Sequence, residues 1–293
     1  MTIQEHAIRN GKVCCPVIDA HTHIGPYHLN GWHQKCDEAV TEKVRNYLVR
    51  LGIDCIVTAP HPMVQGWMEL ANQFAAEMAQ RYSGFVYGYI SVVPNCGMDA
   101  VRQELRRYQS NPQFVGLKFL SGYHGEICQP VYEYAMDFAE EMHCPVLCHE
   151  WGNVPDRSGF EQALRTRHRM QLIIAHQGGG SAADTRACAP IVRGHENCWM
   201  ELCGSLYNQY VVEEIAELTG VEKLIFGTDC INLDPKYELG RVAFSGLTDA
   251  EKCGVFAENY QQVLKNSEMG KIELNGSEAG KHSQQIKQSV EKI

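Results

Sequence analysis

Short runs of apolar, β-branched residues recur along the whole chain, with longer segments between them. The runs cover residues 15–23, 53–60, 85–94, 114–120, 144–150, 171–177, 198–204 and 223–229. Successive runs start from 25 residues (198 to 223) to 38 residues (15 to 53) apart, room for a strand, a crossover helix and two loops. Several runs are continuously apolar, as is typical of parallel strands covered on both faces. We therefore predict eight parallel strands.

The intervening segments carry helical patterns, most clearly over residues 67–82, 99–110 and 131–143. Strand and helix thus alternate throughout, and eight such units close a (β/α)8 barrel. A doubly wound open sheet is the rival fold, but no GxGxxG follows the first run and no acidic residue stands where a ribose would need one. The predicted fold class is α/β, a (β/α)8 TIM barrel that tolerates some distortion.

The barrel domain is expected over residues 1–265, with two helical segments, 236–242 and 249–264, after the last strand. Residues 266–293 form a polar C-terminal tail, for which we favour disorder. The alternative is a terminal helix that docks on a partner subunit, because Ile286, Val290 and Ile293 have helical spacing.

Composition narrows the class of protein. The 293 residues are 44% hydrophobic and 21% charged, close to an ordinary globular protein. The net charge is −9 and no basic run is present, so nucleic acid is not an expected partner. No signal peptide or membrane-spanning segment is recognisable, which predicts a soluble cytoplasmic protein. The 13 cysteines are odd in number and lack a CxxC pair, so we interpret them as reduced, buried residues.

Polar side chains stand at the carboxyl ends of four predicted strands. His21 and His23 close the first run, His149 closes the fifth, His176 the sixth and Asp229 the eighth. Residues two apart on a strand point to the same face, so both imidazoles of the first pair should enter the barrel mouth. Barrel enzymes place their active sites on this carboxyl-end rim.

Three imidazoles and one carboxylate with room for a water form a catalytic metal site, and Zn²⁺ is the first metal to expect. Structural zinc sites instead close all four positions with cysteine or histidine. Any one of these histidines alone would be read as a hydrogen-bonded core or loop residue. The combined set, which ends four different strands on one rim, favours the metal site.

The ordered motifs IDAHTHIG, PVLCHE, IIAHQGGG and FGTD resemble the amidohydrolase superfamily, in particular its amidohydrolase-related branch of metal-dependent TIM-barrel hydrolases and decarboxylases. The resemblance runs from Val17 to Leu264 and includes a closing AENYQQVL segment. An HxH pair alone is a weak signal, whereas the ordered set is a specific one.

This resemblance implies a role for each matching residue. His21, His23 and His149 match metal ligands, and Asp229 matches a carboxylate that binds metal and handles protons. His176 matches a histidine that hydrogen-bonds water or substrate. Lys118 ends the fourth strand, where binuclear relatives carry a carboxylated, metal-bridging lysine. A second metal there is our lesser hypothesis, behind a substrate-facing or ion-paired lysine.

Further polar and aromatic residues follow the predicted strands and could line a substrate pocket. They are His61, Tyr123, His124, Trp151, Arg157 and Arg186. For each of the first four taken alone, loop packing is the interpretation that we prefer. The two arginines could bind a substrate carboxylate with two hydrogen bonds, but a solvated helix charge is the interpretation we prefer. Cys148, Cys203 and Cys230 also lie near the rim, but no base is evident beside them, so we predict no cysteine nucleophile.

The predicted activity is metal-dependent hydrolysis of a small molecule, in which a metal-activated water attacks an amide, ester or lactone. The metal or His176 would polarise the carbonyl, and Asp229 would accept the water proton and pass it to the leaving group. The alternative is a non-oxidative decarboxylase of a small unsaturated or aromatic carboxylate, since ligand spacing does not separate the two reactions. A barrel that binds without turnover is a third reading. By resemblance, a homodimer is a fair expectation.

Overall fold

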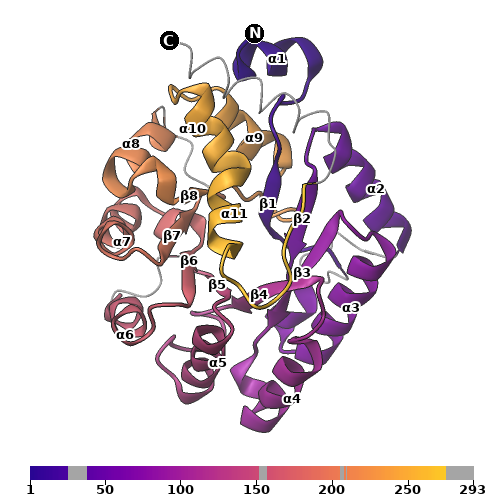
Figure 1. Ribbon diagram of the computed structural model, residues 1–293, viewed down its shortest axis with the longest axis vertical. Coiled ribbons are helices and arrows are strands. Elements are labelled where there is room, and N and C mark those ends of the chain that lie inside the picture. Colours follow the sequence, from indigo (N-terminus) through magenta and orange to yellow (C-terminus); the bar gives the residue numbers. More distant parts are fainter. Residues whose placement is uncertain (26–37, 152–156, 205–207, 209, 275–293) are drawn as a thin grey trace.

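The computed structural model describes residues 1–25, 38–151, 157–204, 208 and 210–274. Eight parallel strands form one sheet in the order of the sequence (Figure 1). They are β1 (Ile18–Thr22), β2 (Cys55–Thr58), β3 (Val86–Ser91), β4 (Phe114–Phe119), β5 (Pro145–Cys148), β6 (Gln171–Ile174), β7 (Cys198–Glu201) and β8 (Leu224–Ile225). Each strand lies inside one of the eight predicted apolar runs.

The sheet returns on itself just after β8. The N–H of Ala20 donates to the carbonyl of Phe226 at 3.1 Å, and the N–H of Asp229 donates to the carbonyl of His21 at 2.8 Å. Thr22 and Cys230 form a parallel bridge. These contacts bring the end of β8 against β1, so the predicted (β/α)8 barrel is confirmed.

Helices surround the strands (Figure 1). The α-helices are α1 (Ile3–Asn10), α2 (Glu38–Arg50), α3 (Met68–Arg81), α4 (Met98–Tyr108), α5 (Pro130–Glu141), α6 (Ser158–Thr166), α7 (Ala182–Gly194), α8 (Val211–Thr219), α9 (Pro235–Ala243), α10 (Asp249–Cys253) and α11 (Asn259–Leu264). Four short 3₁₀ turns, η1 (His61–Gln65), η2 (Pro94–Cys96), η3 (His176–Gly178) and η4 (Val221–Lys223), complete the connections, and a π-helical turn, η5 (Gly254–Glu258), joins α10 to α11. The predicted helices at 67–82, 99–110 and 131–143 correspond to α3, α4 and α5.

The strands are covered on both faces. Every residue of β1 to β5 is buried, which explains why these segments read as continuous apolar runs. A polar side chain on such a strand must find partners in the barrel interior, because an unpaired buried polar group is costly. Asp19 does so by accepting hydrogen bonds from the backbone and hydroxyl of Thr228 at 2.9 and 2.5 Å.

The chain after α11 packs along the amino ends of the strands. The N–H of Gly270 donates to the carbonyl of Phe114 at 2.8 Å, and the side chains of Met269 and Ile272 are buried. A Cβ at Gly270 would lie 2.1 Å from the carbonyl oxygen of Pro112, so this approach needs a glycine. The first part of the predicted tail, up to residue 274, is therefore packed, while residues 275–293, with the three apolar positions at helical spacing, lie outside the described residues.

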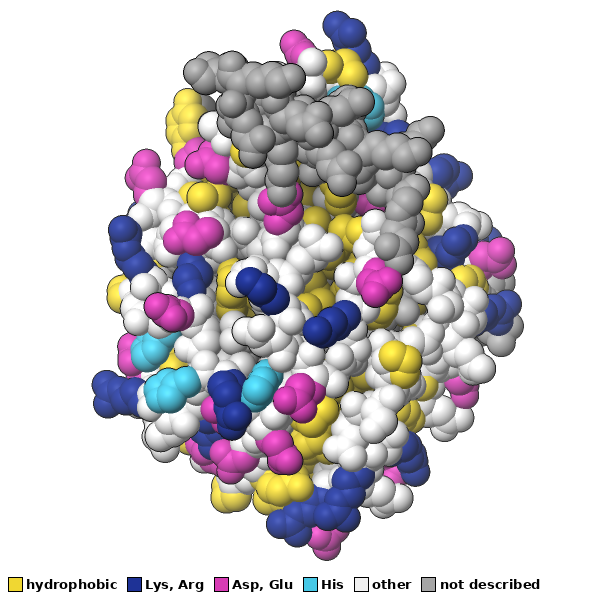
Figure 2. Space-filling model, viewed as in Figure 1, with side chains coloured by type: hydrophobic (Ala, Val, Ile, Leu, Met, Phe, Trp, Pro, Cys, Tyr) yellow, Lys and Arg dark blue, Asp and Glu magenta, His cyan; other side chains and the backbone are white. Residues whose placement is uncertain are grey.

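Both charge signs are interspersed over the described part of the face in Figure 2. None of the described helices combines the length and apolar character needed to cross a bilayer. All twelve cysteines in the described ranges are free, and ten of them are buried, as predicted.

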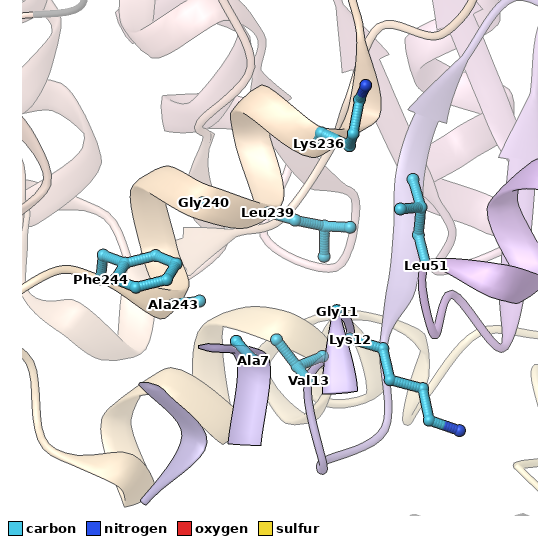
Figure 3. Close-up of a pocket in the computed structure, with 10 residues that line it drawn as sticks. All are labelled: Ala7, Gly11, Lys12, Val13, Leu51, Lys236, Leu239, Gly240, Ala243 and Phe244. Carbon is cyan, nitrogen blue, oxygen red and sulfur yellow. The ribbon is translucent and has the colours of Figure 1, made fainter. Parts of the chain in front are cut away.

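A groove of about 120 Å³ lies between α1, α9 and the end of α2, near the amino ends of the strands. Its lining is mostly apolar and includes Val13, Leu51 and Leu239. The amino nitrogens of Lys12 and Lys236 point away from these side chains (Figure 3). The groove is thus at the opposite end of the barrel from the polar strand ends.

Candidate metal centre

Five polar residues predicted from the strand ends lie at the carboxyl end of the barrel, four of them buried and His149 half-buried. His21 belongs to β1 and His23 follows it; His149 follows β5, His176 opens η3 after β6, and Asp229 follows β8. The backbone φ angles of His176 and Asp229 are 57° and 56°, a left-handed conformation that is unusual outside glycine. Strained backbone of this kind concentrates at functional sites.

His21, His23 and Asp229 converge. The Nε2 atoms of the two histidines are 3.2 Å apart, and Oδ1 of Asp229 lies 3.4 Å from Nε2 of His23 and 3.9 Å from Nε2 of His21. All three donor atoms are within 4.8 Å of one another. The two imidazoles thus point to one place, as the same-face argument predicted.

The outer hydrogen bonds of the two histidines fix their tautomers. Nδ1–H of His23 donates to the carbonyl of Ala59 at 2.6 Å, and Nδ1–H of His21 donates to Oε2 of Glu201 at 3.0 Å. Burial lowers the pKa of both imidazoles well below the usual value, so both are neutral. Two Nε2 lone pairs and a carboxylate oxygen therefore face one another, an arrangement that is stable only with a proton or a cation between these atoms. These residues fit a divalent metal, whose histidine ligands usually donate their second N–H to such partners.

His149 and His176 adjoin this group. Nε2 of His176 lies 2.9 Å from Nδ1 of His149, and the ring centroids of His176 and His21 are 4.9 Å apart. Burial lowers the pKa of His149 to about 3 and that of His176 well below its usual value. Nε2 of His149 is buried and has no hydrogen-bond partner within the described ranges, which suits a metal ligand. His149 belongs to neither group of metal-capable atoms that lie within 4.8 Å of one another, so its membership in the ligand set stays a prediction.

Lys118 on β4 reaches the same place. Its Nζ donates to Nε2 of His21 at 2.7 Å, and the side chain is fully buried. Burial is the main cause that lowers the pKa of Lys118 to about 8. An amine so placed can contact either a substrate or, after carboxylation, a second metal, so both sequence hypotheses for this residue stand.

Sequence reasoning missed Glu201 at the end of β7 and did not connect it with Cys203, which follows that strand near the rim. With His21 and His176 they form a second group of metal-capable atoms within 4.8 Å. The signal was present, since an acidic residue in an apolar run and a cysteine two positions later share one strand face.

The prediction that no base lies beside a rim cysteine is wrong for Cys203. Its Sγ is 3.2 Å from Nδ1 of His176 and 3.3 Å from Nδ1 of His21. Burial raises the pKa of Cys203 well above its usual value, and the charge of Glu201 adds to this. The group is therefore a thiol rather than a nucleophilic thiolate.

Hydrogen bonds connect Asp229 through Asn232 to His61, which lies on the segment after β2. Nδ2 of Asn232 donates to Oδ1 of Asp229 at 3.0 Å, and Nε2–H of His61 donates to Oδ1 of Asn232 at 2.9 Å. The rings of His61 and His23 are 5.1 Å apart, so His61 does reach the site. Burial raises the pKa of Asp229 to about 7, which allows it to gain or lose a proton near neutral pH.

Two aromatic side chains border the histidines. The Trp151 ring lies 5.2 Å from that of His176 and 6.4 Å from that of His149, and Tyr123 lies edge-on to His149 at 5.2 Å. Trp151 is 39% exposed and Tyr123 is 60% exposed, so both present open ring surface next to the site. They are the two substrate-pocket candidates that the structure places best.

The other three candidates have partners within the protein. Arg186 on α7 forms an exposed ion pair with Glu214 of α8, which agrees with the solvated helix charge that we preferred. Arg157 donates to Asp184 at 2.8 Å and contacts the carbonyl of Gly178 rather than pointing free into the rim. His124 is buried and donates to the carbonyl of Met63 at 2.9 Å. Each of these three side chains is thus held by a hydrogen bond or an ion pair to a neighbouring segment.

The sequence profile described as amidohydrolase matches residues 18–264, and the chain belongs to this family. Members are metal-dependent hydrolases or decarboxylases that bind a divalent metal and act on small molecules, so the protein is an enzyme. The family resemblance predicted from the strand-end motifs is therefore confirmed. No curated protein sequence matches this chain.

Solved structures share the fold at low identity. 2,6-Dihydroxybenzoate decarboxylase from Rhizobium superposes with a TM-score of 0.65 at 12% identity, over 86% of this chain and 99% of that one. A dihydroxybenzoic acid decarboxylase from Polaromonas sp. JS666, with bound manganese and 2-nitroresorcinol, gives 0.65 at 12%, over 91% and 99%. 5-Carboxyvanillate decarboxylase from Novosphingobium aromaticivorans, with manganese and 4-hydroxy-3-methoxy-5-nitrobenzoic acid, gives 0.65 at 12%, over 86% and 96%.

Proposed function

We propose that this protein is a metal-dependent hydrolase of a small amide, ester or lactone, with His21, His23, His149 and Asp229 as its metal ligands. The convergence of the two Nε2 lone pairs with the carboxylate of Asp229 carries the proposal. A divalent metal, when bound, would polarise the scissile carbonyl and lower the pKa of a water from 15.7 to about 7. The remaining chemistry belongs to side chains of this chain.

Asp229 is the proton-transfer group in this proposal. Its carboxylate lies beside the two histidine nitrogens, and Asn232 orients it. A pKa near 7 lets the carboxylate take the proton of the attacking water and pass it to the leaving group. His176 stays neutral in its buried position, so it hydrogen-bonds the substrate or the water instead of acting as an imidazolium.

The ligand set of imidazoles and one carboxylate suits Zn²⁺, the metal that we propose first. The same donors also accept Mn²⁺, and manganese is present in the two solved decarboxylases described above. A cytoplasmic location and a homodimer remain predictions from the sequence.

Decarboxylation is the second candidate, and the open rings of Trp151 and Tyr123 favour it. Flat aromatic surfaces bind planar conjugated substrates well. In this reaction Asp229 in its protonated form would supply the proton that replaces the carboxyl group. Burial lowers the pKa of His176, so in this reaction the proton would come from Asp229 and not from an imidazolium at His176.

The test is a product screen with zinc-loaded and manganese-loaded protein. Lactones, esters and amides are followed by acid release, and carboxylated phenols and dienes by CO₂ release. Asp229→Asn should abolish turnover, while the matched control Asp234→Asn, at the surface cap of α9, should leave it unchanged. Turnover that yields only CO₂ would establish the second candidate, and turnover that survives Asp229→Asn would contradict both.

A further inference from the structure

Glu201 collects four hydrogen bonds inside the barrel. Its Oε1 accepts from the N–H of Cys203 at 2.6 Å. Its Oε2 accepts from the N–H of His176 at 3.1 Å, from Nδ1–H of His21 at 3.0 Å and from the thiol of Cys203 at 3.0 Å. The side chain is fully buried. Two of these donors are backbone groups that cannot reverse, so the carboxylate acts as the acceptor.

The direction of these hydrogen bonds determines which ring nitrogen carries the proton in His176 and His149. A thiol has one proton, and that of Cys203 goes to Glu201, so its sulfur accepts from Nδ1–H of His176 at 3.2 Å. Nε2 of the neutral His176 then carries a lone pair and accepts from Nδ1–H of His149 at 2.9 Å. Nε2 of His149 is left with a lone pair, and this is the buried atom that has no partner in the described part of the chain.

Gly227, after β8, provides the room for this arrangement. A Cβ at this position would lie 2.3 Å from Oε1 of Glu201 and 2.8 Å from Cβ of His21. Real Cβ atoms do not approach so closely, so either side chain would have to shift. The segment after β8 can therefore pack this closely against Glu201 because Gly227 has no side chain.

We propose that Glu201 is a positioning residue: it sets the tautomer of His21 directly and those of His176 and His149 through Cys203, so that His21 and His149 each keep on Nε2 the lone pair that would bind a metal ion. This inference rests on the metal site of the proposed function. Its rival is direct metal binding by Glu201 and Cys203, which belong to the second group of metal-capable atoms. The two differ in whether sulfur touches the metal.

The first measurement is the tautomer of each histidine in metal-free protein, from ¹⁵N-histidine NMR at neutral pH. Wild type should carry the proton on Nδ1 of His21, His149 and His176. Cys203→Ala should release His176 and His149 from this tautomer but not His21, and Cys203→Ser should restore all three. Cys198→Ser is the control. Cys198 lies three positions before Glu201 on β7, so its side chain is on the opposite face of the strand, and the substitution should change none of the three tautomers. Nε2–H tautomers in wild type, or no response to Cys203→Ala, would overturn the proposal.

The second measurement is Zn²⁺ affinity by competition with a chelator. Glu201→Gln should bind zinc about 10- to 100-fold more weakly than wild type, as is typical when a partner of a metal-binding histidine is lost. Glu104→Gln is the matched control, because Glu104 is an equally buried carboxylate on α4 that bonds Asn72. Unchanged affinity in Glu201→Gln overturns the positioning role. A wild type with no zinc affinity contradicts the proposed function. The tautomers measured in metal-free protein still test the hydrogen bonds that run from Glu201 to His149.

The third measurement separates positioning from direct ligation. Protein loaded with Co²⁺ should lack a near-ultraviolet thiolate-to-cobalt charge-transfer band. A band in wild type that disappears in Cys203→Ser would place the sulfur on the metal and overturn the proposal. Thermal unfolding of each variant checks that a loss of zinc affinity does not come from a failure to fold.

Discussion

Nδ1 of His21 lies 3.0 Å from a carboxylate oxygen of Glu201, a residue 180 positions further along the chain. The contact joins β1 to β7 inside the barrel and turns the other nitrogen of His21 toward His23 and Asp229. A histidine that binds metal usually has such a partner. The site is thus organised by a residue that touches neither water nor, in our account, the metal.

Gly227→Ala tests this packing from the opposite side. The new methyl group would collide with Glu201 and His21, so we expect Zn²⁺ affinity to fall by about tenfold or more, as in the loss of an outer partner. Chelator competition measures the effect. Gly194→Ala, where a Cβ meets nothing within 4 Å, is the control. Wild-type affinity in Gly227→Ala would show that the room around Glu201 is not needed.

His176→Asn should separate catalysis from metal binding. His176 contacts His149 and Cys203 but is not among the ligands that we propose. At saturating Zn²⁺ we expect the variant to retain its metal, although it loses the hydrogen bond that orients His149, and to lose about 10²- to 10⁴-fold in kcat, the usual size of a lost polarising or proton-transfer group. Elemental analysis and turnover of the substrate found by screening measure the two properties. His195→Asn, in an ion pair with Glu161 away from the site, should change neither. Loss of the metal from His176→Asn would make His176 a ligand.

Lys118→Met tests the charge beside the site. Burial lowers the pKa of Lys118 to about 8, so the side chain is mostly an ammonium at pH 7 and mostly neutral at pH 9. A positive charge repels a metal ion, and unit charges about 4 Å apart repel by roughly 4 kcal/mol at an effective dielectric constant near 20. Between pH 7 and 9 the metal affinity of wild type should therefore rise more steeply than that of Lys118→Met.

At pH 7 the same variant should bind metal at least about tenfold more tightly than wild type, since it lacks the charge. Chelator competition at the two pH values gives both results. A carboxylated, bridging Lys118 predicts the opposite, because its removal would release metal. Two metal equivalents in wild type that fall to one or none in Lys118→Met would therefore support the second-metal hypothesis.

Gly270→Ala tests the packing of the chain after α11. The added Cβ would lie 2.1 Å from the carbonyl oxygen of Pro112 and 2.8 Å from that of Phe114, and backbone atoms yield little. We expect the free energy of unfolding to fall by about 1–3 kcal/mol, the usual cost of overpacking. Urea unfolding measures it. The control is Gly240→Ala in α9, where the methyl group has open space and should be neutral or stabilising. Equal stability of Gly270→Ala and wild type would mean that this segment adds nothing to the fold.

The barrel was predictable because parallel strands covered on both faces must be apolar along their length. All eight runs became strands, and the polar residues that end them lie together at one rim. His21 and His23 were readable as a pair from two-residue spacing alone. The same rule would have paired Glu201 with Cys203, but Glu201 was overlooked because its run resembled an ordinary buried strand.

Other features depend on three-dimensional contacts that no local pattern encodes. Asn232 lies on the loop after Asp229, and only the fold shows that it connects His61 to that carboxylate. Arg157 and Arg186 follow strands as a substrate-binding arginine would, yet each is paired with an acidic residue of a neighbouring segment. The polar residues 266–274 have too little hydrophobic periodicity to predict packing, and their position rests on backbone hydrogen bonds.

Metal stoichiometry tests the central claim most directly. Wild type and His23→Ala are purified in parallel, equilibrated with Zn²⁺, freed of loosely held ions and analysed for metal content. A single site built on His21, His23, His149 and Asp229 predicts about one zinc per chain in wild type and less than about a tenth of that in His23→Ala. Wild-type protein without zinc, or a His23→Ala variant with the full equivalent, would contradict the account.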